Sequence, residues 1–178
     1  PTLYNVTWIG AGCESGAQNN TSLLLRDGTG GFVYNSIFTA SRFGIEVEDR
    51  PSGLDSRQRM ENGELILANN LWGGFCNGND LVAGEGGFIR ATEDAEDPSA
   101  QFLIDHLANN ANVLGDPAMT ISRTADGTFN PSPDRESDAA TAPRKGLPFD
   151  DPFFTRSCFL GAFDPIEEAG VWIQNWTA

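Results

Sequence analysis

Lysine and histidine are almost missing from this chain of 178 residues, which has one of each, Lys145 and His106. Acidic residues outnumber basic residues by 25 to 11, so the formal net charge is −14. Such a surface lacks the basic footprint of a general nucleic-acid binder or of a protein that binds anionic membranes. A single histidine also excludes most histidine-based zinc sites. We interpret His106 as a half-buried helix residue that is bonded locally.

Long apolar runs are missing too. No stretch approaches the roughly 20 residues that span a bilayer, and nothing resembles a signal peptide. The chain starts at Pro1 without methionine, so we expect a processed piece of a longer precursor. Its 20 glycines give a turn-rich composition that suits a helix bundle poorly.

A short strand pattern repeats in the first half of the chain. Residues 23–27 (LLLRD) and 45–49 (IEVED) match at an offset of 22 residues. In a second series, residues 4–8, 34–38 and 68–72, an asparagine is followed three residues later by an aromatic residue. The spacings in that series are 30 and 34 residues, and both approach 22 once polar insertions at 10–20 and 50–62 are subtracted.

A repeat of this length, with asparagine and glycine at its corners, is typical of a parallel β-solenoid. Equivalent residues of successive coils would then stack about 4.8 Å apart. We expect an asparagine ladder and an aromatic column, formed by Asn5, Asn35 and Asn69, and by Trp8, Phe38 and Trp72. A β-sandwich whose hairpins happen to repeat is the alternative.

The chain divides into two parts of one structural unit. We expect about three coils over residues 1–92, with insertions at 10–20 and 50–62. The second part, residues 93–178, should hold a helix over 97–109, because Asp97 can cap its N-terminus and Pro98 suits the first helical position. A surface loop should follow over 123–151, and an irregular capping segment over 152–178.

The three cysteines, Cys13, Cys76 and Cys158, show no metal-binding spacing. They could be small buried thiols. One disulfide and one free thiol would also fit the count, and a Cys76–Cys158 bridge would tie the last regular coil to the C-terminal segment.

Several segments resemble the C-terminal part of large bacterial secreted or surface proteins with a right-handed parallel β-helix fold, related in shape to pectate lyases. The resemblance lies in residues 4–10 (YNVTWIG), 23–27, 34–39 (YNSIFT) and 67–72 (LANNLW), and in the closing segment 153–163 (FFTRSCFLGAF). It implies an all-β fold, a right-handed parallel β-helix fragment with one short helix and an irregular cap. It also implies export to the cell surface or the extracellular space, and further N-terminal coils. It implies no established activity and no catalytic residues.

Four carboxylates are the candidates for metal chemistry. On stacked strands Asp27 would lie over Asp49, with Glu46 and Glu48 beside them. Carboxylates about 5 Å apart suit a retaining glycosidase, and such a cluster also suits Ca²⁺, which takes six to eight oxygen ligands. The alternative is that Arg26 and Arg50 neutralise these carboxylates on a solvated face. We therefore expect no cofactor other than calcium.

These observations favour a non-enzymatic structural or adhesive protein, secreted or on the cell surface, that is a subunit of a larger assembly. The Thr2–Ile9 end should expose unpaired strand edges and apolar residues, so we expect the missing N-terminal coils or another protein chain to contact it. A polysaccharide-binding or polysaccharide-degrading module, dependent on calcium, is the alternative. We expect no nucleic-acid partner and no membrane span.

Overall fold

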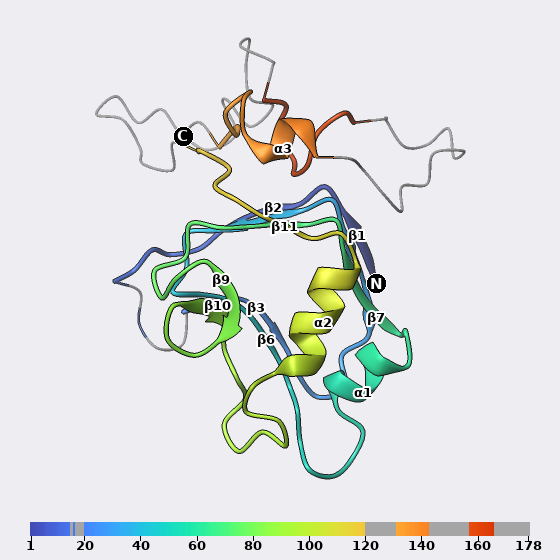
Figure 1. Ribbon diagram of the computed structural model, residues 1–178. Coiled ribbons are helices and arrows are strands. Elements are labelled where there is room, and N and C mark those ends of the chain that lie inside the picture. Colours follow the sequence, from blue (N-terminus) through green and yellow to red (C-terminus); the bar gives the residue numbers. More distant parts are fainter. Residues whose placement is uncertain (15, 17–19, 120–130, 143–156, 166–178) are drawn as a thin grey trace.

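Every strand pair in the computed structural model is parallel, over the described residues 1–14, 16, 20–119, 131–142 and 157–165. The strands belong to three sheets that bound a common interior (Figure 1). Hairpins would give antiparallel pairs, so the sandwich alternative does not apply to this part of the chain.

The first two sheets follow chain order. Sheet 1 contains β1 (Thr2–Tyr4), β4 (Gly31–Tyr34) and β7 (Leu65–Ala68), in that order. Sheet 2 contains β2 (Thr7–Ile9), β5 (Ile37–Thr39), β8 (Leu71–Trp72) and β11 (Val113–Leu114). Successive side chains point to opposite faces of each sheet, and the apolar side chains that face the interior belong to the main core.

Sheet 3 contains β3 (Thr21–Leu25), β6 (Phe43–Val47), β10 (Gly87–Ile89) and β9 (Asp80–Ala83), in that spatial order. β3 pairs with β6 so that Leu23 lies beside Ile45 and Leu25 beside Val47. The strand pairing predicted from the 22-residue offset is therefore confirmed.

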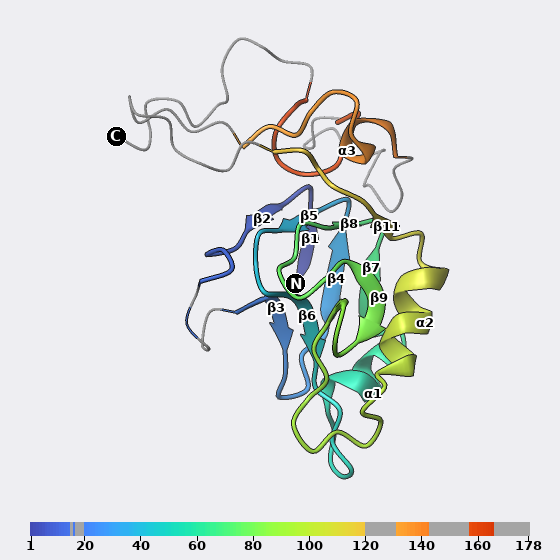
Figure 2. The same cartoon turned by 60° about the vertical axis from the view of Figure 1, so that its left-hand side comes forward.

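Three helices complete the described structure. They are α1 (Ser56–Glu61), α2 (Gln101–Asn109) and α3 (Asp138–Thr141). Asp55 caps α1, because its side chain accepts a hydrogen bond from Gln58 N. α2 contacts β7 and α1, and it buries Leu103 and Leu107 in the core. Figure 2 shows α2 at one end of the molecule and the N-terminal strands at the other.

The predicted fold class, an all-β right-handed parallel β-helix of about three coils, is wrong. Three parallel sheets are combined with short helices, with about 14% helix and 28% strand among the described residues, an α/β-like arrangement rather than a single solenoid. β10 lies between β6 and β9, so sheet 3 departs from chain order. α2 lies against β7, and α1 occupies part of the stretch 50–62 that we expected to be an irregular insertion.

The second part of the chain also differs from the prediction. The helix expected over 97–109 ends as predicted but begins at Gln101, because Ala100 has a left-handed backbone conformation. Asp97 instead accepts hydrogen bonds from Ser99 N and Gln101 N, and so orders the turn before the helix. The described part of the expected loop 123–151 contains α3. The rest of that loop, and the capping segment 152–178 outside 157–165, lie outside the described residues.

Candidate functional site

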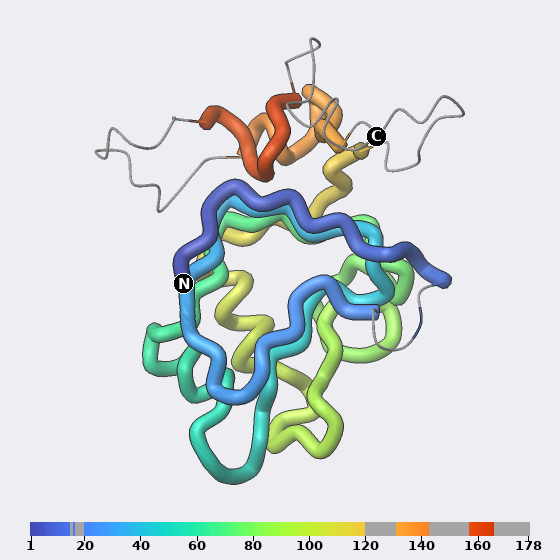
Figure 3. The backbone as a smooth tube through the Cα atoms, turned by 180° about the vertical axis from the view of Figure 1, so that it is seen from behind, coloured from blue at the N-terminus to red at the C-terminus, as the bar shows by residue number. Residues whose placement is uncertain are grey.

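One end of the molecule consists of three strand edges. β1, β2 and β3 are the terminal strands of sheets 1, 2 and 3, and within the described residues each pairs on one side only. Figure 3 shows the segment that carries β1 and β2 in front of the later ones when the molecule is seen from behind. We call the exposed edges of these three strands the open end.

Core side chains are uncovered at the open end. Trp8 lies in register with Phe38 and Trp72 along sheet 2. Phe38 and Trp72 are 2% and 0% exposed, whereas Trp8 is 47% exposed. Leu3 is likewise 45% exposed, although it lies in register with the buried Val33. Leu3 and Trp8 are each the last described member of a column, a row of core side chains that lie in register on neighbouring strands.

The strands of the open end lack charged residues and proline, two of the features that commonly protect an edge strand. Natural edges are commonly guarded by charges, proline, bulges or very short strands. Residues 2–9 and 20–25, which contain β1, β2 and β3, include no charged residue and no proline, in a chain that is 20% charged. Leu24 on β3 adds a further apolar side chain that is exposed. These edges can therefore accept another extended backbone.

The opposite end, which we call the closed end, is covered. At the outer edge of β7, His106 Nε2 accepts a hydrogen bond from Leu67 N at 3.0 Å, and Asn112 Nδ2 donates one to Leu67 O at 2.9 Å. Burial lowers the pKa of His106, which favours the neutral ring that this bond requires. The outermost strand of sheet 2 there, β11, has only two residues, and that of sheet 3, β9, begins with the charged Asp80.

The predicted asparagine ladder is only partly continuous. Asn69 Nδ2 donates to Asn35 Oδ1 at 2.6 Å, deep in the structure. Asn5 instead donates from Nδ2 to Phe159 O and Gly161 O in the C-terminal segment, and to the Ser157 hydroxyl. All three asparagines have positive φ angles of 53–56°, which asparagine tolerates better than most residues.

A second polar series follows one residue later, and we did not predict it. Asn70 Oδ1 accepts from Ser36 N, and Asn112 Oδ1 accepts from Asn70 N, from Asn70 Nδ2 and from Trp72 Nε1. Ser36 Oγ in turn accepts from Val6 N at 3.1 Å. A polar residue follows two of the three expected corner asparagines, Asn35 and Asn69, and this was the available signal. It extends to Asn112 only if a spacing of 42 residues from Asn70 is allowed.

The stacked part of the aromatic column contains Phe38 and Trp72 as predicted, and Phe88 rather than Trp8 is the third stacked ring. Phe38 and Trp72 stack with ring centroids 4.3 Å apart, and Trp72 also stacks on Phe88. On sheet 1, Tyr4 stacks on Tyr34 at 5.2 Å. Phe38, Trp72 and Phe88 therefore cover one another, whereas Trp8 at the open end is 47% exposed.

The calcium candidates are engaged in ion pairs and hydrogen bonds. Glu48 Oε1 lies 2.6 Å from Arg50 Nη2, and Glu48 Oε2 accepts from Asp27 N. Asp49 Oδ1 lies 3.1 Å from Arg57 Nη1, and Asp49 Oδ2 accepts from Asp97 N. The Asp27 side chain is exposed and pairs with Arg26.

Glu46 completes this acidic group. Burial raises its pKa, while the positive charges of Arg90 and Arg26 act in the opposite direction. Arg57 donates hydrogen bonds to both Glu61 and Asp49, and these bonds raise the pKa of its guanidinium group. Each of the four candidate carboxylates thus has a guanidinium group within ion-pair distance. The described residues hold no group of three or more histidine, cysteine or acidic side chains placed to bind a metal ion.

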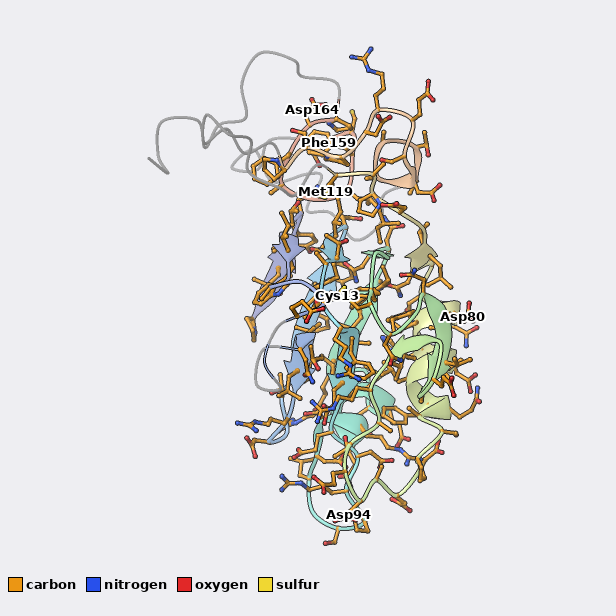
Figure 4. All side chains as sticks on the ribbon, turned by 90° about the vertical axis from the view of Figure 1, so that its left-hand side faces the viewer. Cys13, Asp80, Asp94, Met119, Phe159 and Asp164 are labelled. Atoms are coloured by element: carbon orange, nitrogen blue, oxygen red, sulfur yellow. A yellow bond between two sulfur atoms is a disulfide. The ribbon has the colours of Figure 1, made fainter. Side chains whose placement is uncertain are left out.

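The predicted Cys76–Cys158 bridge is wrong, because Cys76 forms a disulfide with Cys13. Cys13 follows β2 at the open end and lies beside that end in Figure 4. Cys158 is a free, exposed thiol in the C-terminal segment. The bridge closes a loop of 63 residues. Because Cys13 follows β2 and Cys76 follows β8, it connects the segments after the first and third strands of sheet 2.

The C-terminal segment covers the outer face of sheet 2. Leu160 and Ala139 pack against Ile37 and Leu71, and all four are buried. Figure 4 places Phe159, Met119 and Asp164 in this cover, beyond the edge of the sheets. The open end remains uncovered by these described residues, since Leu3 and Trp8 keep their exposure.

Among the described residues, no helix has the length and apolar character needed to cross a membrane. Comparison of the chain with protein-family models, curated proteins and solved structures gives no match. The resemblance to bacterial secreted proteins therefore stays a prediction.

Proposed function

We propose that this protein is a non-enzymatic structural or adhesive component of a secreted or cell-surface assembly, and that another protein chain binds its open end. The observation that carries the proposal is the exposure of Leu3 and Trp8 beside three uncharged strand edges with which no described strand pairs. Covering a half-exposed tryptophan removes on the order of 100 Å² of apolar surface from water, which contributes about 2.5 kcal/mol.

The extracellular setting is supported by the cysteines. Disulfides persist in oxidising compartments and are rare in the cytosol. The Cys13–Cys76 bridge is compatible with such a compartment. The acidic surface, with a net charge of −14, suits a protein that stays soluble outside the cell.

Site-specific photo-crosslinking in the cells that produce the protein tests the proposal. A benzophenone amino acid replaces Trp8 in one variant and Leu54 in another; Leu54 is an exposed apolar residue outside the open end. We expect a covalent adduct with one defined protein, in the surface or extracellular fraction, from position 8 only. Leu3→Glu should abolish that adduct. Equal labelling from both positions, or no adduct from position 8, would overturn the proposal.

A further inference from the structure

The backbone groups of the open end are oriented to accept a strand. In a parallel ladder, alternate residues bond to opposite neighbours. Val6 O accepts from Ile37 N at 2.8 Å, and Gly10 N donates to Thr39 O at 2.9 Å. The alternation therefore directs the backbone N–H and C=O groups of Thr7 and Ile9 away from β5, toward the open side.

The same argument applies to β1. Pro1 O accepts from Phe32 N, and Asn5 N donates to Tyr34 O. The backbone groups of Thr2 and Tyr4 thus face the open side. β1 and β2 belong to different sheets, and both present backbone donors and acceptors at the open end. β3, the terminal strand of sheet 3, lies at the same end.

The side chains define what can lie over these strands. Leu3 and Trp8 each stand at the end of a column whose next member is buried, Val33 and Phe38 respectively. A strand added in the same register would bring one apolar side chain over Leu3 and one large apolar side chain over Trp8. Tyr4, which is partly buried, shows the aromatic stacking that is possible along sheet 1, because its ring stacks on that of Tyr34 in the next strand.

Charge and direction argue against a second copy as the occupant. Each copy carries a net charge of −14, so two copies repel one another. A two-fold axis between two open ends would also make every facing strand pair antiparallel, whereas all eight described strand pairings are parallel. A head-to-tail copy would meet the closed end, where α2 covers the edge of β7.

We propose that the open end binds a non-acidic, extended polypeptide segment that adds to β1 and β2 as a parallel strand layer and places apolar side chains over Leu3 and Trp8. This proposal rests on the proposed function and specifies the partner at the same surface. Main-chain hydrogen bonds supply the affinity of such strand addition, and the two apolar positions supply its specificity.

The probe for a binding test is a synthetic peptide with the sequence of residues 31–39, the segment that already pairs in parallel with residues 2–9. It carries two additional arginines for solubility and a fluorophore, and its binding to the full chain is followed by fluorescence anisotropy. We expect saturable binding, and no binding of a peptide with the same composition in scrambled order. Absence of binding would overturn the inference.

Two substitutions at Ile9 separate backbone from side-chain effects. Ile9→Pro removes an N–H group that faces the open side without removing a bond to β5. We expect it to weaken peptide binding about tenfold, the effect of one lost hydrogen bond. Ile9→Val keeps the N–H group and should bind within about twofold of the original protein. Equal affinity of the two variants would contradict strand addition. Cooperative thermal unfolding verifies that both are folded.

Strand direction is tested by disulfide trapping. A Thr2→Cys and Cys158→Ser protein is mixed with peptides that carry an activated cysteine in place of either Phe32 or Thr39. Thr2 lies in register with Phe32, so parallel addition should trap the first peptide faster. Faster trapping of the second would show antiparallel addition, and a concentration-dependent dimer lost in Ile9→Pro would identify a second copy. Either result overturns this inference and leaves the photo-crosslinking test of the proposed function intact.

Discussion

The two ends of the molecule continue the same core columns but finish them differently. At the closed end, α2 buries Leu103 and Leu107, and His106 and Asn112 satisfy the backbone of Leu67. At the open end, Leu3 and Trp8 are nearly half exposed, and no described strand pairs with the outer edge of β1 or β2. The described residues thus cap one edge with a helix and leave the other uncapped, which makes the open end a surface available for association.

Alanine substitution at the two ends of one column should give the largest contrast. Trp72→Ala removes a fully buried ring that stacks on Phe38 and Phe88, so we expect the free energy of unfolding to fall by about 4 kcal/mol. Trp8→Ala removes a half-exposed ring and should lower it by about 1 kcal/mol. Urea unfolding measures both. Similar losses at the two positions would mean that the open end is not open in solution.

Removing the disulfide tests the link between the two regions. The Cys13→Ser and Cys76→Ser double variant loses the closure of a 63-residue loop. In the chain-entropy account this lowers the free energy of unfolding by at most about 4 kcal/mol, and we expect about 3 kcal/mol. Cys158→Ser is the control and should leave thermal unfolding unchanged. A drop in stability with Cys158→Ser, and none with the double variant, would refute the pairing.

Acid should weaken the closed end through His106. Its pKa is lowered by burial, so between that value and the ordinary value of 6.5 the unfolded chain binds more protons than the folded one. The contribution of His106 to the free energy of unfolding is therefore fully present above about pH 6.5 and is lost as the pH falls below that value. His106→Gln keeps an acceptor for Leu67 N but does not titrate. Urea unfolding from pH 7.5 to 5 should show a smaller loss for this variant, and identical pH profiles would refute the assignment.

Extending the asparagine ladder should stabilise the closed end slightly. Asn69 Oδ1 is buried and has no hydrogen-bond donor, and the next position in register is Ala111, at a φ of 55°. Ala111→Asn places an amide there and suits a left-handed residue, so we expect a gain of about 1 kcal/mol. Ala118→Asn is the matched control, because Ala118 also has a positive φ, of 52°, but is exposed. A gain no larger than that of the control would mean that no bond to Asn69 forms.

Local pairing could be predicted from the sequence, and global arrangement could not. The 22-residue offset placed Leu23 beside Ile45 because stacked apolar residues alternate on both strands. Nothing local indicated that β10 would lie between β6 and β9, since that order depends on packing across a distant loop. The helix start also could not be predicted locally, because no sequence signal marks Ala100 for the left-handed conformation that delays the helix to Gln101.

The candidate site shows the same division. Thr2–Ile9 was predicted as an exposed edge because it forms the first coil of the expected solenoid, and its contact with a partner stays a prediction. The arginines that engage the carboxylates were only partly foreseen, because Arg57 and Arg90 reach Asp49 and Glu46 from other elements. The pairing of Cys13 required the fold, since three cysteines allow three single bridges and their spacing favours none.

Amide hydrogen exchange on the full chain tests the central claim, the difference between the two ends, most directly. In the free protein, we predict that the amides of Thr7 and Ile9 exchange rapidly and that those of Phe38 and Leu71 are strongly protected. Adding the residue 31–39 peptide should slow exchange at Thr7 and Ile9 and leave the closed end unchanged. Equal protection of Thr7, Ile9 and Leu71 in the free monomer would contradict the existence of an open end.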